Sequence, residues 1–398
     1  MKKSMIVAAM LAMVATGANA KSATDSATIA KNKPVFTVVK QNPITSIKDQ
    51  NRSGTCWAYS TLSYFESEIL KHTGKTYDLS EMFVANKTYM DRATMAVRMH
   101  GDVSFSQGGS AYDVLYALQH YGIVPEGAMP APGTLTGDSL ANFGEFFDVM
   151  TPYVEAVAKS NAKKISSAWK SGLQGIIDSY IGKTPEKFTY QGKQYTPQSF
   201  CQSLGLNLDD YVTITSYTHH PMWSKFAVEV QDNWRWPLSY NVPMDDLCKI
   251  IDNAINNGYT VAWGGDVTED GFTRKGLGIA YDVKKVRSMA GTDADHWFKL
   301  SKDEKKEKFD SLGVNAPEVV PTQAMRQEAF DNWETTDDHG MHIYGIAKDQ
   351  NGKEYYMVKN SWGEYGDYKG TWYMTKAFVA YKTMDFMVNK NALPKDIR

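Results

Sequence analysis

The segment Gln50–Ala58 constrains this chain most strongly, because it places a cysteine at the start of an apolar, helix-like run. After Cys56, apolar residues recur with helical spacing, for example at Leu62 and Ile69. A helix N-terminus carries unpaired N–H groups and a partial positive charge, which favours a thiolate. Gln50 lies six positions earlier, and a side-chain amide can donate to a developing oxyanion. The segment therefore predicts a nucleophile with part of its oxyanion hole.

Cys56 alone would not establish a reactive site, because most free cysteines are buried structural residues. Two distant segments strengthen the prediction. Residues 337–347 and 355–363 are rich in β-branched and aromatic side chains and are separated by a polar turn, which predicts a hairpin. The hairpin would bring His339 and Asn360 to neighbouring strands. Such a histidine takes the thiol proton and returns it to a leaving amine, while the amide oxygen fixes its tautomer.

Four segments in this order resemble the signatures of papain-like cysteine peptidases. They are Gln50, Gly54-Thr55-Cys56-Trp57, Asp338-His339 and Asn360-Ser361-Trp362-Gly363. The resemblance implies a catalytic group of Cys56, His339 and Asn360, with Gln50 and the Cys56 N–H binding the oxyanion. It also implies that Trp362 covers the His–Asn hydrogen bond beside the substrate. Ser53 stands where the family usually has a disulfide cysteine, so other contacts must hold that loop.

The spacing of these segments narrows the resemblance to one branch. His339 follows Cys56 by 283 residues, about twice the papain interval. A papain core with a large insertion is similar to the bleomycin hydrolase and aminopeptidase C branch. Further segments fit this branch at residues 108–110, 121–125, 261–267 and 326–332. The resemblance covers roughly residues 40–390.

The resemblance implies an α+β papain-like fold, with a helical left subdomain and an antiparallel, barrel-like right subdomain. The catalytic cleft lies between the two. A large, mainly helical insertion is expected at about 130–260, because apolar residues show helical spacing over 139–182. Most strands are expected within 259–282 and 338–374. Further helices are expected at 56–72, from Ser80 onward, at 113–121 and at 245–257, with short extended segments at 35–39 and 212–215.

Four residues are expected to contact substrate: Gly108, Gly109, Asp338 and Trp362. The glycine pair is an ordinary loop in isolation, but within the papain pattern its bare main chain suits an extended substrate. By resemblance, Asp338 offers its backbone carbonyl to the substrate. We expect the preceding Asp337 to lie in a solvated turn.

Neither a metal nor another cofactor is expected. His339 and His342 stand three apart on a predicted strand and face opposite sides, so they cannot chelate one ion together. His219 and His220 have no partner at the spacing of a known metal motif. We expect these two histidines to line the cleft or to lie at the surface.

The first twenty residues are typical of a signal peptide. Lys2 and Lys3 precede a short apolar run at 5–17, and Ala18-Asn19-Ala20 is a small-x-small cleavage site. The run is too short to span a membrane. We therefore expect a secreted or periplasmic protein without a membrane span.

The domain boundaries follow from these assignments. Residues 1–20 are the predicted signal peptide, 21–45 a flexible leader, 46–390 the peptidase domain and 391–398 a short tail. Whether the leader is processed further stays open.

The amino-acid composition and net charge narrow the range of expected binding partners. The net charge is −2 without a basic block, so nucleic acid is not expected. Peptides are the expected substrates, and the family resemblance permits a homo-hexamer without requiring one. If Cys56 is the nucleophile, Cys201 and Cys248 are left; we favour two free thiols over a disulfide, which only geometry can decide.

The favoured function is an aminopeptidase acting through a thioester acyl-enzyme. In the resembled branch, a C-terminal arm lies in the cleft and its carboxylate selects a free amino end. Only 38 residues follow Asn360 here, which looks shorter than that arm. An endopeptidase with an open cleft is therefore the alternative, and a non-catalytic papain-like binding protein is a third. Side-chain preference is not readable from the sequence.

Overall fold

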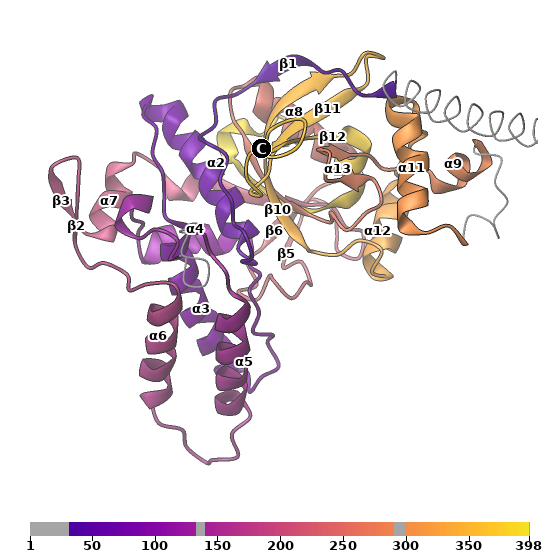
Figure 1. The fold of residues 1–398 in the computed structure, drawn as a ribbon. Coiled ribbons are helices and arrows are strands. Elements are labelled where there is room, and N and C mark those ends of the chain that lie inside the picture. The colour runs from indigo at the N-terminus through magenta and orange to yellow at the C-terminus, as the bar shows by residue number, and fades with distance from the viewer. Residues whose placement is uncertain (1–31, 133–139, 290–298, 398) are drawn as a thin grey trace, which may run out of the picture.

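The computed structural model describes residues 32–132, 140–289 and 299–397 (Figure 1). The helices are α2 (Cys56–Thr73), α3 (Glu81–Arg98), α4 (Ala111–His120), α5 (Gly144–Ala158), α6 (Ala168–Tyr180), α7 (Pro197–Ser203), α8 (Met244–Asn256), α9 (Val283–Met289), α11 (Lys302–Leu312), α12 (Gln323–Asp331) and α13 (Lys376–Lys382). Short 3-10 helices are η1 (Glu126–Ala128), η2 (Leu208–Asp210), η3 (Gly313–Asn315) and η4 (Lys390–Ala392).

Eleven of the described strands form one sheet, and the other two form a hairpin. They are β1 (Thr37–Gln41), β2 (Phe188–Tyr190), β3 (Lys193–Tyr195), β4 (Tyr211–Thr215), β5 (Lys225–Phe226), β6 (Ser239–Asn241), β7 (Val261–Gly265), β8 (Phe272–Thr273), β9 (Leu277–Gly278), β10 (His339–Lys348), β11 (Glu354–Lys359), β12 (Thr371–Thr375) and β13 (Thr383–Asn389). The large sheet runs β5-β6-β4-β13-β7-β10-β11-β12-β9-β8, and β1 pairs with β10.

A helical side and a sheet side lie next to each other, as Figure 1 shows. Helix α2 packs on β10 and β7 where the two sides meet. Its buried face includes Trp57, Leu62 and Phe65, which belong to a core shared with α3 to α6. The helix ends at Gly74, whose φ of +69° suits glycine. Since β10 starts with His339, this packing brings the two predicted catalytic segments to one boundary. The mixed architecture confirms the predicted α+β class.

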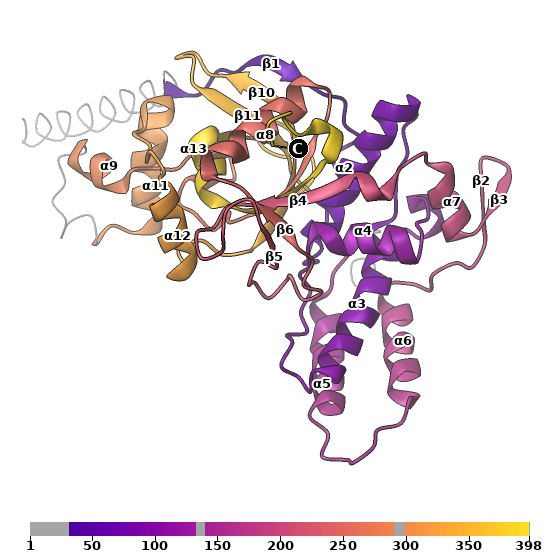
Figure 2. The ribbon, with the colours of Figure 1, turned by 180° about the vertical axis from the view of Figure 1, so that it is seen from behind.

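The helical insertion begins with α5 and α6, which project side by side from the body of the molecule (Figures 1 and 2). Their apolar positions face each other and α3, as the spacing predicted. The insertion also contributes β4, β5 and β6 to the large sheet. Of these, only a strand near 212–215 is expected from the sequence.

Strand β13 lies near the middle of the sheet, between β4 and β7. The strands expected from the sequence cover β7 to β12 but not β13. Its seven residues are mostly buried, so the strand lacks the clean alternation that marks a half-exposed strand. A central strand from the C-terminal part of the chain was therefore missed.

The N-terminal assignments are only partly within the described residues. The predicted signal peptide and most of the leader lie outside them. Within the leader, Thr37–Gln41 forms β1 and pairs with β10 in antiparallel fashion. None of the described helices combines the length and hydropathy that a membrane crossing requires.

The three cysteines are free in the structure. Cys201 belongs to the helical core, whereas Cys248 packs beside the sheet core with α8. Cys201 and Cys248 are therefore two free thiols in the structure rather than a disulfide.

Candidate active site

The loop before Cys56 is held by hydrogen bonds rather than by a disulfide. The Ser53 hydroxyl lies 2.7 Å from the Gln50 carbonyl and 2.6 Å from the Thr55 hydroxyl. The Gly54 N–H donates to the Gln107 side-chain oxygen at 2.7 Å. These hydrogen bonds take the place of the disulfide that Ser53 cannot form. They hold the loop that leads into α2.

Cys56 and His339 line one cavity of about 240 Å³ between the helical side and the sheet. Cys56 is the first residue of α2 and His339 the first of β10. Gly340 allows the strand to approach, because a Cβ there would lie 2.7 Å from the Ser60 hydroxyl and 3.3 Å from the Cys56 carbonyl. The structure thus brings together two residues that are 283 positions apart.

The His339 ring is fixed by two neighbours. Its Nε2 lies 2.8 Å from the Asn360 Oδ1 across the β10–β11 pair. The Trp362 ring lies 4.9 Å from the His339 ring, centre to centre. Because Asn360 and His339 are both buried, the hydrogen bond is shielded from water. The Nδ1 atom is therefore left for the thiol or the substrate.

Gln50 is buried beside this group but does not line the cavity described above. Its amide nitrogen donates to the Ser53 carbonyl at 2.7 Å, and its oxygen accepts from the Ser361 hydroxyl at 2.6 Å. A side-chain amide carries two N–H bonds, so one is still available to an oxyanion. These bonds also fix which end of the amide faces the Cys56 loop.

Burial keeps both members of the thiol–imidazole pair neutral in the empty site. Burial raises the pKa of Cys56 to about 12, with contributions from Asp337 and Asp232, although the N–H groups of Gly340 and Trp57 oppose it. Burial lowers the pKa of His339 to about 4, although the hydrogen bond that its Nε2 donates to Asn360 opposes this shift. In the empty site, burial thus opposes the stabilisation of a thiolate that the helix position favours.

Gly108 and Gly109 line the same cavity. A Cβ on Gly108 would lie 1.8 Å from an Asp232 oxygen, and one on Gly109 would lie 2.9 Å from the Trp57 ring. Arg92 holds this wall by donating to the Gly108 carbonyl at 2.5 Å and to Asp232 at 3.1 Å. Glycine is therefore required here by packing, and the bare main chain faces the cavity.

Comparison with known proteins identifies the family. The chain matches the Peptidase C1-like family over residues 2–333 and 318–398. It belongs to this family. Aminopeptidase G of Lactobacillus delbrueckii subsp. lactis is 24% identical, over 89% of this chain and 83% of the relative. Aminopeptidase C of Lactobacillus helveticus is also 24% identical, over 91% and 85%.

Other comparisons agree with the bleomycin hydrolase and aminopeptidase C branch predicted from the sequence. Bleomycin hydrolase of Rattus norvegicus is 22% identical, over 93% of this chain and 86% of the relative. The crystal structure of PepW from Lactobacillus rhamnosis HN001 superposes with a TM-score of 0.68 at 20% identity, over 94% of this chain and 85% of that one. The chain is therefore a cysteine-type peptidase with a papain-like fold.

Asp337 in this C1-like peptidase does not lie in a solvated turn, so that expectation was wrong. It lines the cavity together with Asp232 and Asp385. Burial and the neighbouring Asp232, Asp385 and Asp338 raise the pKa of Asp337 well above its usual range. Burial raises the pKa of Asp385 to about 6. No local sequence pattern predicts this acidic wall, because its members come from three distant segments.

Asp338 also lines the cavity of this peptidase. Its carboxylate accepts from the Val267 N–H at 2.9 Å and the Thr268 hydroxyl at 2.8 Å. Burial raises its pKa to about 7. The Asp338 side chain thus connects the start of β10 to the residues that follow β7. The predicted contact of Asp338 with substrate would be made by its backbone carbonyl.

His219 and His220 do not line the catalytic cavity of this peptidase. They lie at the surface, which is one of the two expected positions, and Glu229 contacts both rings. Sequence motifs missed Glu229 because the chain passes through β5 between the histidines and the glutamate.

Proposed function

We propose that this cysteine peptidase hydrolyses peptide bonds as an aminopeptidase, through a thioester acyl-enzyme. The Cys56 sulfur attacks the peptide carbonyl carbon while its proton passes to His339. His339 then gives that proton to the leaving amine as the C–N bond breaks. Water, deprotonated by His339, hydrolyses the thioester and restores the thiol. In each step His339 acts as the base or the acid beside the sulfur.

The remaining site residues serve the same reaction. Asn360 holds the imidazole through the 2.8 Å hydrogen bond to Nε2. The free N–H of Gln50 and the Cys56 backbone N–H bind the oxyanion. Gly108, Gly109 and the Asp338 carbonyl offer main-chain contacts to an extended peptide, and Trp362 shields the His–Asn bond. These roles are the ones that the papain resemblance implies. The positions of Gly108, Gly109 and Asp338 in the cavity wall support the substrate contacts.

The observation that carries the aminopeptidase assignment is the acidic wall beside Cys56. Asp232, Asp337 and Asp385 line the cavity that holds the nucleophile. Arg92 forms an ion pair with one of these residues, Asp232. A substrate's terminal ammonium is the group that such a wall binds, since its charge stabilises half-buried carboxylates in their ionised form. The ammonium would replace the proton that burial favours on Asp337.

The deciding experiment compares two peptides that differ only in N-terminal acetylation. We expect cleavage one residue from the free amine and a large rise in KM on acetylation. Asp337→Asn and Asp385→Asn should erase the preference for the free amine while leaving cleavage of the acetylated peptide intact. Asp245→Asn, at an exposed position, is the matched control. Equal cleavage of both peptides by the parent enzyme would exclude the aminopeptidase.

An endopeptidase is the second candidate, favoured by the position of the C-terminal residues. Ala392 and Leu393 pack in the sheet core, and the Asn253 amide donates to the Ala392 carbonyl. Among the described residues, none after Asp385 lines the cavity. Internal cleavage of the acetylated peptide would identify this activity. If thiol-directed peptide inhibitors do not label the protein, it would instead be a non-catalytic binding protein.

We further propose that residues 1–20 direct export and are removed after Ala20. Positive charge followed by a short apolar run and a small-x-small site supports this assignment. N-terminal sequencing of the protein from culture medium or periplasm is the test. Full-length protein confined to the cytoplasm would refute it.

A further inference from the structure

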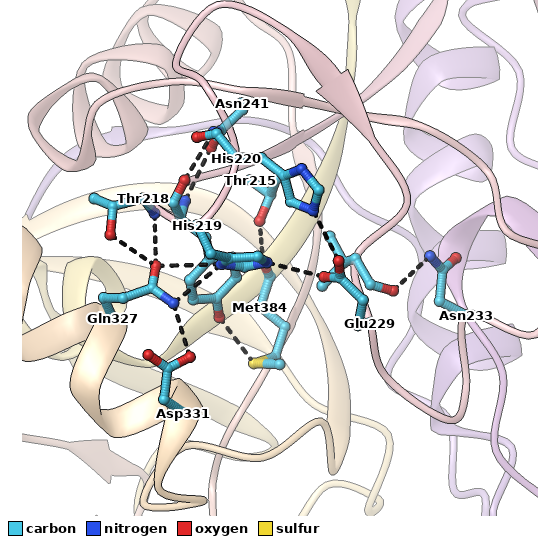
Figure 3. A network of polar contacts seen from close by, with 12 residues as sticks. Thr215, Thr218, His219, His220, Glu229, Asn233, Asn241, Gln327, Asp331 and Met384 are labelled. Carbon is cyan, nitrogen blue, oxygen red and sulfur yellow. Dashed lines mark hydrogen bonds and ion pairs between the residues drawn. The ribbon is translucent and has the colours of Figure 1, made fainter.

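Two adjacent histidines and a glutamate form a compact cluster outside the catalytic cavity. His219 and His220 lie in the turn between β4 and β5, and Glu229 follows β5. Figure 3 shows both imidazole rings directed at the one carboxylate. The reaction proposed above uses none of these three side chains.

The donor atoms of this cluster converge. His219 Nε2 lies 2.9 Å from one Glu229 oxygen, and His220 Nε2 lies 2.8 Å from the other. One ligand atom from each of the three residues lies within 4.8 Å of the others. Two imidazole nitrogens and a carboxylate are a common protein ligand set for zinc. The cluster thus has the composition and spacing of a three-ligand metal site.

Both rings are held by neighbours that leave their Nε2 atoms directed at Glu229. The His219 ring stacks on Phe330 at 5.6 Å, and the His220 ring stacks on Phe226 at 4.2 Å. Gln327 of α12 lies beside His219 Nδ1, with its nitrogen at 3.0 Å and its oxygen at 3.4 Å. A partner on the second ring nitrogen orients a ligating histidine.

The main chain of the histidine turn is fixed as well. Asn241 is fully buried, and its amide donates to the carbonyls of Tyr217, His220 and Pro221 at 2.8 to 3.1 Å. Gln327 accepts from the Thr218 N–H at 2.6 Å. These bonds hold adjacent histidines in an arrangement that lets both reach one point, so little ordering is required on binding.

The three side chains of the cluster are accessible from solvent. The Glu229 side chain is 55% exposed and the two histidines are 29% and 36% exposed, so an ion and a water ligand can enter from solvent.

We propose that His219, His220 and Glu229 bind one divalent transition-metal ion of the zinc class. Zn–N and Zn–O bonds of about 2.0–2.2 Å need ligand atoms roughly 3.3 Å apart in a tetrahedron. The Glu229 oxygens now lie 2.9 Å from His219 Nε2 and 2.8 Å from His220 Nε2. A small movement of Glu229 away from the two rings would bring these distances to that value. Water completes the fourth position. Imidazole ligands disfavour Mg²⁺ and Ca²⁺, which prefer oxygen.

The bound ion would brace one wall of the catalytic cavity. Val228 and Val230, on either side of Glu229, both line that cavity. The Asn233 amide donates to the Val228 carbonyl at 2.9 Å, and the adjacent Asp232 belongs to the acidic wall. Tying Glu229 to the histidine turn and α12 therefore fixes the segment that carries Asp232.

The test is a Zn²⁺ titration of the metal-free protein by isothermal calorimetry, in a Cys56→Ala background that removes the reactive thiol. We expect one zinc per chain, a rise in Tm with zinc and no comparable binding of Mg²⁺. His219→Ala, His220→Ala and Glu229→Gln should each weaken zinc binding at least tenfold. Gln327→Ala should weaken it by about tenfold through the lost orientation of His219.

The matched control is His100→Asn, a change at a surface histidine whose φ of +54° asparagine tolerates. It should bind zinc like the parent. Circular dichroism of each metal-free variant shows whether it is folded; Glu229→Gln keeps the size and a hydrogen-bond acceptor. Absence of stoichiometric zinc binding, or equal binding by the parent and a folded Glu229→Gln protein, would overturn the proposal.

Discussion

His339 and Asn360 are joined by a 2.8 Å hydrogen bond between Nε2 and Oδ1, although 21 positions separate them. The bond spans β10 and the end of β11, and both residues are buried. The same Asn360 oxygen accepts from the Ser361 N–H at 2.8 Å. The oxygen, not the nitrogen, is thereby directed at the imidazole. This places the Nε2 proton on His339 and leaves Nδ1 basic.

Replacement of Asn360 by alanine should lower kcat with little change in KM. The imidazole would lose the acceptor that fixes its tautomer, and a lost buried hydrogen bond costs about 1–3 kcal/mol, which corresponds to roughly 5- to 150-fold. Steady-state kinetics on a fluorogenic amino-acid amide measures it. Asn256→Ala, at an exposed position on α8, is the control, and an unchanged kcat for Asn360→Ala would contradict the orienting role.

Replacement of Cys56 by alanine should reduce turnover by at least about a thousandfold, because no other thiol lines the cavity among the described residues. The variant should also resist a thiol-directed peptide inhibitor, as mass spectrometry of the intact protein will show. Cys248→Ala removes a half-buried thiol elsewhere and should retain both activity and labelling. Normal turnover by Cys56→Ala would refute the nucleophile assignment.

Replacement of Gln50 by alanine should leave a residual rate. Loss of one oxyanion donor typically costs about 2.7–4 kcal/mol in the transition state. Because Gln50 also contacts Ser53 and Ser361, part of the loss could come from the loop. Gln50→Glu keeps the acceptor to Ser361 but removes the amide donor. A kcat equal to that of the parent in Gln50→Glu would exclude oxyanion binding by this side chain.

Gly108→Ala should destabilise the protein and reduce activity. The added Cβ would lie 1.8 Å from an Asp232 oxygen, so Asp232 must move away from Arg92, which leaves a buried guanidinium without its partner. Thermal unfolding and kinetics of the variant measure both effects. Gly127→Ala, where a Cβ meets nothing within 4 Å, should have little effect. A Gly108→Ala enzyme with parental Tm would argue against the close approach.

Asp385→Asn should raise Tm more at pH 8 than at pH 4. Burial raises the pKa of Asp385 to about 6, above its value of about 3.9 in an unfolded chain. The native state therefore binds this proton more tightly, and stability is lost as pH rises between about 4 and 6. Asparagine removes that loss, and a gain of about 2 °C or more is expected at pH 8. An equal shift at both pH values would exclude ionisation as the cause.

The local structure around the candidate catalytic residues was predictable, because it depends on residues that are close in the sequence. Cys56 opens a helix with an apolar face, and the hairpin that carries His339 and Asn360 has strand-forming residues around a polar turn. Ser80 was expected to start a helix, and its hydroxyl accepts from the Phe83 N–H at 3.1 Å. Such features depend on neighbours within a few positions, which the sequence displays directly.

The acidic wall and the Glu229 cluster were not predictable in this way. Asp232, Asp337 and Asp385 meet only because β13 and the segment between β5 and β6 fold against the start of β10. Nothing near Asp337 in the chain distinguishes a buried carboxylate from a solvated one. Side chains brought together by long-range sheet pairing leave no short motif, and they are where the sequence-based expectations were wrong.

The position of β13 has a consequence for how the molecule is made. Its residues pair with β4 and β7, which precede it by more than a hundred positions. Until those last strand residues have left the ribosome, the edges of β4 and β7 have no neighbour there and their main-chain groups stay unpaired. The two parts of the sheet that β13 joins can therefore come together only after residues 383–389 have been made, so this region cannot complete its fold while the preceding segments are being synthesised.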